Sequence, residues 1–238
     1  MRKAIFQDLK KIDYKKAWDY QEEIFNKVLT NKATAVSGCC NSEETDAGYI
    51  LFCEHPHVFT LGKSGVENNL LIDPGFLGKI GATYYKINRG GDITYHGPGQ
   101  LVGYPILNLE LLGLQVKQYI YLLEEAIIKT LSGFGISSSR MKNATGVWLD
   151  AEESGKSRKI CAIGVRASRY ITMHGFAFNI NTDISYFGYI NPCGMADKGV
   201  TSLQKELGEA QDTEKVKEEV KGHLSELFGL RLEEAKTA

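Results

Sequence analysis

One cysteine of this sequence stands where a thiol could do chemistry. Cys193 lies in the segment Asn191-Pro192-Cys193-Gly194-Met195. A cysteine between proline and glycine belongs to a constrained turn rather than to the interior of a strand. A thiol becomes a nucleophile only as the thiolate, which needs a nearby cation, a base or a helix N-terminus. Cys193 is therefore a candidate nucleophile, although a loop cysteine without a chemical role is the commoner case.

A lysine could be the partner that the thiol requires. Lys159 begins the apolar stretch Lys159-Ile160-Cys161-Ala162-Ile163-Gly164, at the edge of a predicted strand. A partly buried amine there could take the thiol proton and stabilise the thiolate. The charge pattern alone favours the other reading, a solvated lysine beside Arg158 at the end of a loop.

The most unusual segment is residues 89–100, which is rich in glycine and has Pro98 between its last two glycines. Glycine lets a backbone approach a ligand closely and adopt positive φ, so this segment is a candidate wall for a bound group. A hairpin with two tight turns explains the composition equally well. A phosphate-binding P-loop is excluded here, because no Gly-Lys-Ser/Thr closes the motif. Gly62-Lys63-Ser64 has that ending, but His57 stands where the first glycine is required.

Two other patterns give weaker hypotheses. Cys53-Glu54-His55-Pro56-His57 contains residue types that bind metals, but no second cluster stands at a zinc-like spacing. We therefore expect no metal site. A Ser-His-Asp hydrolase is not supported either, because the sequence has no Gly-x-Ser-x-Gly motif.

Three stretches with helical spacing of apolar residues must help to position these segments. They are residues 14–29, 116–131 and 213–228, with Asp13 and Asp212 as candidate N-caps. A shorter helix is expected from Thr201, where Gln204 would complete a capping box, to Gly208.

Between the helices the sequence predicts strands. They cover residues 49–53, 58–61, 83–88, 101–107, 147–149, 159–166 and 171–180. Strands clustered between flanking helices predict an α+β fold built on a mixed or antiparallel sheet. No repeat or long linker interrupts residues 1–238, so we expect a single catalytic domain.

Composition limits the class of protein. The net charge of the 238 residues is -1, which argues against a nucleic-acid partner or an anionic membrane surface. No apolar run approaches the length that spans a bilayer, and residues 1–10 lack the apolar core of a signal peptide. The five cysteines are odd in number and irregularly spaced, which predicts reduced thiols and a cytoplasmic protein.

Taken together, the three segments closely resemble the octanoyltransferase family, also called lipoate-protein ligase B. Residues 89–100 are similar to its glycine-rich substrate loop, residues 159–164 to its lysine strand, and residues 191–195 to its cysteine motif. Residues 55–62 and 175–179 match further landmarks of the family. The combination is specific where each motif alone is not.

The resemblance, which covers about residues 14–203, implies a fold and a reaction. The fold would be a mixed β-sheet flanked by helices, like the catalytic domain of biotin and lipoate protein ligases. The reaction would move octanoyl from octanoyl-acyl carrier protein to a lysine amine on lipoyl domains of 2-oxoacid dehydrogenases and on the glycine cleavage H protein. This is the first committed step of protein lipoylation. Octanoyl would rest in between as a thioester on Cys193, with Lys159 as its companion and with no ATP, metal or other cofactor.

The resemblance also implies the walls of an octanoyl site. His96 is expected to orient the glycine-rich loop rather than to act as a base. Cys161 stands where the family has a small residue such as alanine, so a second thiol is expected near the site. The expected wall residues are Arg89, Gly90, Gly91, Asp92, Ile93, Thr94, Tyr95, His96, Ala162, Ile163, Gly164, Gly175, Phe176 and Ala177.

Three other functions fit parts of the same pattern. An ATP-dependent lipoate ligase would share the fold but need no nucleophilic cysteine, and the segments around His96 and Cys193 favour the transferase. An amidotransferase that moves octanoyl between carrier proteins would use the same cysteine chemistry. An acyl-binding protein without turnover would form no covalent adduct.

Overall fold

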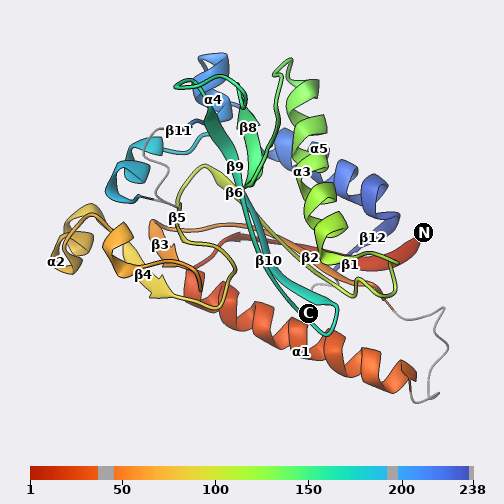
Figure 1. Cartoon of the computed structure of the whole chain (residues 1–238). Coiled ribbons are helices and arrows are strands. Elements are labelled where there is room, and N and C mark those ends of the chain that lie inside the picture. Colours follow the sequence, from red (N-terminus) through yellow and green to blue (C-terminus); the bar gives the residue numbers. More distant parts are fainter. Residues whose placement is uncertain (37–45, 192–197, 236–238) are drawn as a thin grey trace.

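A computed structural model describes residues 1–36, 46–191 and 198–235. Most of the described strands form one mixed sheet (Figure 1). From one edge to the other, its strands are β12 (Leu230–Glu234), β1 (Arg2–Lys11), β2 (Gly48–Glu54), β6 (Gln100–Leu107), β10 (Ile171–Asn179), β9 (Arg158–Ser168), β8 (Ala144–Leu149) and β7 (Ser139–Met141). The first three run parallel, and each strand from β2 onward is antiparallel to the next. A short strand, β11 (Gly199–Val200), lies parallel to the start of β9.

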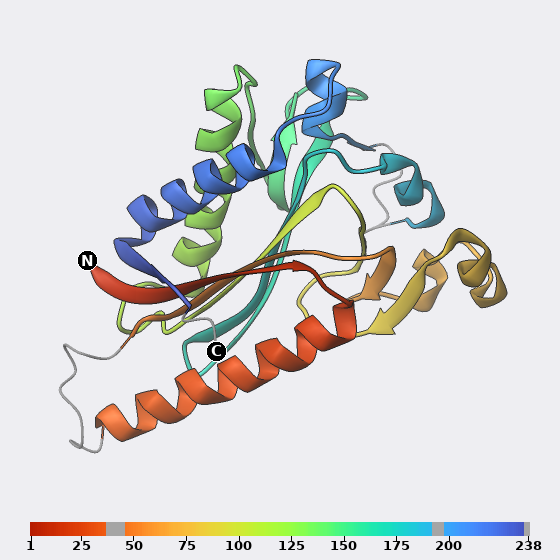
Figure 2. The ribbon, with the colours of Figure 1, turned by 180° about the vertical axis from the view of Figure 1, so that it is seen from behind.

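Helices cover both faces of this sheet (Figures 1 and 2). They are α1 (Tyr14–Val36) on one face, and α3 (Val116–Gly133) and α5 (Thr213–Phe228) on the other. The alternation of side chains along β2 shows why both faces need cover. Ile50 and Phe52 join the core beneath α3 and α5, whereas Leu51 and Cys53 join the core beneath α1. A shift of one residue in register would exchange these two sets.

The ends of the helices follow from local sequence. The side chain of Asp212 accepts hydrogen bonds from the amides of Glu214 and Lys215, and Gly229 ends α5 with a φ of 62°. Asp13 accepts a hydrogen bond from an amide in the first turn of α1. Both aspartates are therefore the N-terminal caps that the sequence predicts.

A second, three-stranded sheet carries part of the glycine-rich segment. In it β3 (Val58–Leu61) lies between β4 (Thr83–Lys86) and β5 (Ile93–His96). Short helical turns accompany this sheet: η1 (Glu67–Asn69), α2 (Pro74–Leu77), η2 (Gly78–Ile80) and η3 (Ile184–Tyr189). Its core joins Phe59 and Tyr95 to Ile190, the residue that follows η3. Residues 89–100 thus cross from the small sheet to β6 of the large one.

The predicted α+β fold with a mixed sheet and flanking helices is confirmed. Strands β1, β5, β7, β11 and β12 are absent from the predicted set, and α1 runs on to Val36. The predicted capping box at Thr201 is wrong: α4 (Leu203–Leu207) is capped by Ser202, whose hydroxyl accepts from the amide of Lys205. Thr201 instead continues the pairing with β9, because its amide donates to the backbone oxygen of Lys159. Of the helices in the described ranges, none is long and apolar enough to cross a membrane.

Candidate active site

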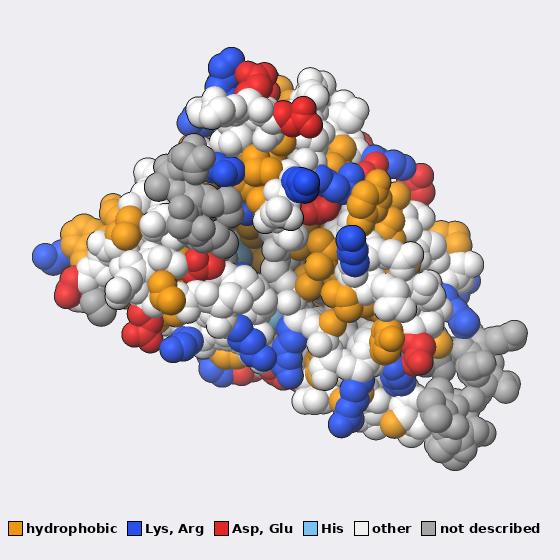
Figure 3. Space-filling model, in the orientation of Figure 1, with side chains coloured by type: hydrophobic (Ala, Val, Ile, Leu, Met, Phe, Trp, Pro, Cys, Tyr) orange, Lys and Arg blue, Asp and Glu red, His pale blue; other side chains and the backbone are white. Residues whose placement is uncertain are grey.

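A cavity of about 650 Å³ opens where the glycine-rich segment meets β6, β9 and β10. The space-filling view shows a hollow in this face of the molecule, bordered in part by apolar side chains (Figure 3). Residues 89–94 form one wall, and residues 143–145 and 198–200 contribute to others. The cavity thus gathers segments that are far apart in the sequence.

The floor of the cavity consists of small residues on two paired strands. Ala162 of β9 lies opposite Ala177 of β10. Two residues further along β9, Gly164 lies opposite Gly175. Residues that face each other across antiparallel strands point to the same side of a sheet, so these four positions leave a hollow. Val102 of β6, which lies opposite Ala177, continues this apolar floor.

Arg89 holds the glycine-rich wall against β9. Its guanidinium donates hydrogen bonds to the backbone oxygens of Gly90 and Asp92, at 2.9 and 2.7 Å. The amide of Gly90 donates to the backbone oxygen of Val165 at 3.2 Å. A Cβ on Gly164 would stand 2.7 Å from a guanidinium nitrogen of Arg89. Glycine at position 164 is therefore what allows the wall to approach the strand.

Asp92 fixes the other side of the same wall. Only 9% of this residue is exposed. Its carboxylate accepts hydrogen bonds from the side-chain nitrogen of Asn69 and from the amide of Ile93, each at 2.6 Å. Hydrogen bonds to a buried carboxylate are strong, so Asp92 ties the loop to η1, the helical turn beside the small sheet.

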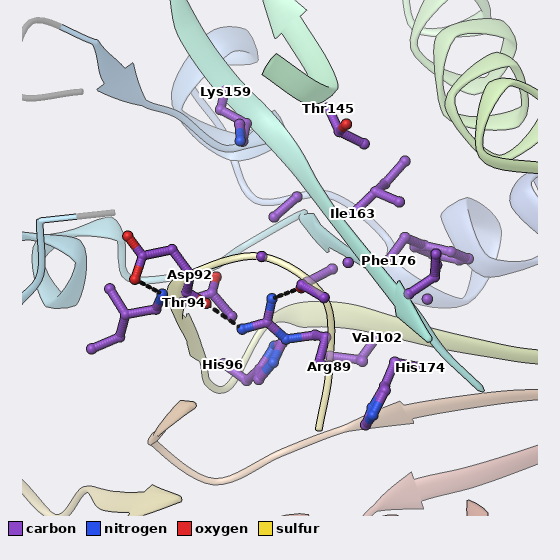
Figure 4. Close-up of a pocket in the computed structure, with 18 of the residues that line it drawn as sticks. Arg89, Asp92, Thr94, His96, Val102, Thr145, Lys159, Ile163, His174 and Phe176 are labelled. Carbon is purple, nitrogen blue, oxygen red and sulfur yellow. Dashed lines mark hydrogen bonds between the residues drawn. The ribbon is translucent and has the colours of Figure 1, made fainter. Parts of the chain in front are cut away.

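Lys159 lies on β9 at one end of the cavity (Figure 4). Its Nζ is 4.6 Å from the centroid of the Trp148 ring, within the range of a cation–π interaction. Trp148 is 2% exposed, and its Nε1 donates to the backbone oxygen of Ala144 at 2.9 Å. The lysine stem passes Gly146, where a Cβ would stand 3.4 Å from Cδ and Cε. β8 therefore fixes both the stem and the amine.

A chain of hydrogen bonds connects the glycine-rich segment to the backbone around Lys159. Nδ1 of His96 lies 2.8 Å from Oε1 of Gln100, whose Nε2 donates to Oδ1 of Asn179 at 2.9 Å. Nδ2 of Asn179 donates to the backbone oxygen of Thr201 at 3.0 Å. The amide of Thr201 in turn donates to the backbone oxygen of Lys159. These five residues form a continuous polar path behind the cavity.

The histidines around the cavity are neutral. Burial lowers the pKa of His55 to about 4 and the pKa of His96 and His174 to about 3. His55 donates from Nδ1 to the backbone oxygen of Ile12 and accepts at Nε2 from the hydroxyl of Tyr104. Because both ring nitrogens are engaged, His55 is not available as a metal ligand.

Two of the cysteines are described, and neither is suited to catalysis. Cys53 and Cys161 are buried, and burial raises the pKa of both thiols. Cys161 faces the core beneath α3 and α5 rather than the cavity. On a regular strand, residues two apart point to the same face, so Lys159 and Cys161 would share a face. The pairing of β8 with β9 shifts between these two residues, and they do not share one.

The structure brings Lys159 and the expected wall residues to this cavity, with the exception of Tyr95. Tyr95 is fully buried in the core of the small sheet, where its hydroxyl lies 2.7 Å from Nδ1 of His57. Cys193 lies outside the described residues. Lys198, the first described residue after it, lines the cavity.

Several cavity residues were not expected from the sequence. Trp148 sits in a predicted strand, and nothing in its neighbourhood marks the ring as a partner for Lys159. Gln100 and Asn179 lie at the ends of two of the distinctive segments. A polar residue at the end of an apolar strand was the signal that could have identified them.

The sequence matches known proteins over almost its whole length. A family model described as the lipoyl protein ligase A/B catalytic domain matches residues 13–225. A protein of Bacteroides fragilis named octanoyltransferase is 55% identical over 91% of this chain and 94% of its own length. Another octanoyltransferase, from Cytophaga hutchinsonii, is 48% identical over 98% of this chain and 95% of its own length. This chain belongs to the octanoyltransferase family. It is an acyltransferase.

Solved structures share the fold of this family member. A bi-partite lipoate protein ligase from Thermoplasma acidophilum aligns over 100% of this chain and 88% of its own, with a TM-score of 0.69 and 12% identity. A biotin protein ligase from Aquifex aeolicus aligns over 96% of this chain and 71% of its own, with a TM-score of 0.51 and 14% identity. The expected likeness to the catalytic domain of biotin and lipoate ligases is confirmed at the level of fold.

Proposed function

We propose that this acyltransferase moves an octanoyl group from acyl carrier protein to a lysine amine of a lipoyl domain, with Cys193 carrying the group as a thioester. The cavity carries the proposal. Its floor is apolar, the amine of Lys159 lies at its end, and residues 198–200, which soon follow Cys193 in the chain, line it. The shared name of the close relatives supports octanoyl as the group that is transferred.

An octanoyl chain fits the floor in length. Its seven carbon–carbon bonds span about 8 Å, at the roughly 3.3–3.6 Å that three bonds of an extended chain cover. Lys159 and Ala162 stand three residues apart on β9, or about 10 Å at roughly 3.3 Å per residue. A carbonyl near Lys159 therefore leaves the tail over Ala162. Six buried methylenes stabilise the bound chain by about 5 kcal/mol, at about 0.8 kcal/mol each.

In the first half-reaction Cys193 is the nucleophile and Lys159 the acid and base. The amine of Lys159 takes the thiol proton, which gives a thiolate beside an ammonium. The thiolate attacks the thioester carbonyl of the donor, so a new carbon–sulfur bond forms and the bond to the pantetheine sulfur breaks. The ammonium then protonates the departing sulfur, which leaves octanoyl-Cys193 and a neutral Lys159 amine.

In the second half-reaction the acceptor lysine attacks the octanoyl-cysteine as a neutral amine. A carbon–nitrogen bond forms and the carbon–sulfur bond breaks. Lys159 takes the proton that the nitrogen loses, and Cys193 leaves as the thiolate, so the enzyme returns to its starting ion pair. Exchange between thioesters is close to balanced and transfer to an amide is downhill, so the proposed cycle needs no ATP.

The acceptors that we propose are the lipoyl domains of 2-oxoacid dehydrogenases and the glycine cleavage H protein. The structural relative from Thermoplasma acidophilum is described together with its E2 lipoyl domain, which supports an acceptor of this class. The donor is octanoyl-acyl carrier protein. A donor panel that also contains an octanoylated lipoyl carrier distinguishes this reaction from transfer between carriers.

Intact-protein mass spectrometry tests the proposal. After incubation with octanoyl-acyl carrier protein, we expect one octanoyl adduct that hydroxylamine removes and that is absent from the Cys193→Ala variant. Lys159→Ala should fold and form the adduct far more slowly. Persistence of the adduct without Cys193 would refute the assignment. Efficient product from free octanoate, ATP and a lipoyl domain would instead identify an ATP-dependent ligase, and a protein that binds octanoate without any adduct would be an acyl-binding protein.

A further inference from the structure

The proton on His96 can be located from the hydrogen bonds behind it. The backbone oxygens of Thr201 and Tyr95 can only accept hydrogen bonds. Nδ2 of Asn179 and Nε2 of Gln100 therefore donate to them, at 3.0 and 3.2 Å. Oε1 of Gln100 is consequently the acceptor for Nδ1 of His96, at 2.8 Å. Nδ1 carries the proton, and the lone pair of the neutral ring is on Nε2.

The surroundings of His96 keep the ring neutral and fixed. The residue is 6% exposed, and burial is the main reason why its pKa falls to about 3, with the nearby His55 and Arg89 as further causes. Its ring stacks on Tyr14, with centroids 5.8 Å apart and an angle of 12° between the planes. So weak a base does not take up a proton at neutral pH. It can still accept a hydrogen bond.

The lone pair on Nε2 is left for a ligand. His96 lines the cavity, in the same wall as Arg89 and Thr94 (Figure 4). Among the residues that the structure describes, no donor is bonded to Nε2, whereas Nδ1 is engaged by Gln100. The network therefore presents one oriented acceptor to the cavity.

We propose that Nε2 of His96 accepts a hydrogen bond from the amine of the incoming lysine and so aims the nitrogen lone pair at the octanoyl-Cys193 carbonyl. This role rests on the proposed function. The octanoyl chain has no donor and the thioester has only acceptors, so the ligand that can use Nε2 must carry an N–H. The positive charge of Arg89 near His96 disfavours an ammonium there and favours the neutral amine.

The step balances with His96 as a positioning acceptor. One N–H of the amine is held by Nε2, and the proton of the other N–H passes to Lys159 as the carbon–nitrogen bond forms. The carbon–sulfur bond breaks, and its electrons remain on Cys193. His96 neither gains nor loses a proton. The pantetheine amide is the other N–H donor that could reach the site, but it is present only in the first half-reaction.

Separate measurement of the two half-reactions tests the role. His96→Phe keeps the stacked ring and removes the lone pair, so it should slow acyl transfer several-fold more than it slows enzyme acylation. Transfer from preformed octanoyl-Cys193 to a lipoyl domain should slow about fivefold to tenfold, the worth of one neutral hydrogen bond. His96→Gln, whose amide oxygen can accept, should recover part of the transfer rate. His223→Gln on α5 is the matched control and should change neither rate.

Each contrary result has a distinct meaning. An unchanged transfer rate in His96→Phe would overturn the role. Slowing of acylation alone would also overturn it and would indicate the pantetheine amide as the ligand. Equal slowing of both half-reactions would overturn it too and would indicate that His96 only maintains the shape of the cavity. A wild-type enzyme without any octanoyl adduct would overturn the proposed function and this role with it.

A measurement on the unaltered enzyme accompanies these variants, because His96→Phe leaves the buried oxygen of Gln100 unpaired. Nitrogen-15 NMR of the histidine rings should show His96 as the neutral tautomer protonated at Nδ1 throughout pH 5 to 8. A proton on Nε2, or titration of His96 near pH 6.5, would contradict the proposal.

Discussion

At the scale of single residues, several titratable groups in and beside the cavity each hold one protonation state. His96 and His174 are neutral because they are buried, and the thiol of Cys161 keeps its proton for the same reason. Lys159 differs from them, because its Nζ faces the ring of Trp148, which favours the ammonium. In the proposed cycle, proton exchange is thus confined to Lys159 and its thiol partner.

Replacement of Trp148 tests whether its ring shifts the protonation equilibrium of the Lys159 amine. Trp148→Leu removes the cation–π interaction, worth about 1–2 kcal/mol in a desolvated site. We expect the acylation rate at neutral pH to fall about tenfold and the pH midpoint of acylation to move to lower pH, because the amine loses a group that favours its ammonium. Trp148→Phe keeps an aromatic face, so its acylation rate and pH midpoint should lie between those of Trp148→Leu and those of the wild type. Rates of adduct formation from pH 6 to 9 measure both effects. An unchanged pH profile in the leucine variant would remove Trp148 from the mechanism.

At the scale of elements, the sequence predicts those elements whose signals are local. α5 shows its apolar stripe, the cap Asp212 and the terminal Gly229 within one short stretch. β12 has no such signal, since it is short and pairs with β1 from the opposite end of the chain. β7 is three residues long and mostly polar. β12 is therefore determined by pairing with a distant strand, and β7 by its hairpin pairing with β8, so neither strand has a local pattern of its own.

The same distinction applies to the site. Gly164 and Gly175 stand in distinctive segments, so the floor of the cavity could be expected from the sequence. The contact of Lys159 with Trp148 depends on the irregular pairing of β8 with β9, which only the folded sheet reveals. The bond between Gln100 and Asn179 likewise joins two strands that are distant in sequence.

An ion-pair cluster between α3 and the β7–β8 hairpin supports this region. Nε of Arg140 lies 3.0 Å from the carboxylate of Glu124, and another of its nitrogens lies 2.7 Å from Glu125. The other carboxylate oxygen of Glu124, which is 7% exposed, accepts from the amide of Gly146 beside Lys159. Arg140 thus neutralises a buried charge that fixes the backbone next to the amine.

Removal of this arginine should weaken the hairpin. Arg140→Ala leaves the carboxylate of Glu124 without its cation, so we expect the free energy of unfolding to fall by about 1–3 kcal/mol. Urea unfolding at pH 7.5 measures the loss. Lys142→Ala, at an exposed neighbouring position, is the matched control and should change it by less than about 0.5 kcal/mol. A loss in Arg140→Ala no larger than in the control would show that Glu124 is satisfied without the cation.

At the scale of the whole molecule, the region between the two sheets concentrates buried histidines. The rings of His55 and His96 are 5.9 Å apart in an edge-to-face contact. His174, also buried, donates through Nε2 to Asn88 at 2.8 Å. Its φ of 62° lies in the left-handed region, a strained backbone that the surrounding contacts must maintain. The same packing that shapes the cavity therefore makes the fold depend on three uncharged imidazoles.

This dependence predicts how stability varies with pH. The pKa of His55 is lowered from 6.5 to about 4, and those of His96 and His174 to about 3, so the unfolded chain binds these protons more readily. Stability is fully present above pH 6.5 and is lost as the pH falls toward 4. Three protons give a slope of up to about 4 kcal/mol per pH unit near pH 5. Urea unfolding between pH 7.5 and 4.5 measures it. His55→Gln should reduce the slope by about a third, whereas the surface variant His223→Gln should not, and equal slopes in all three proteins would contradict this account.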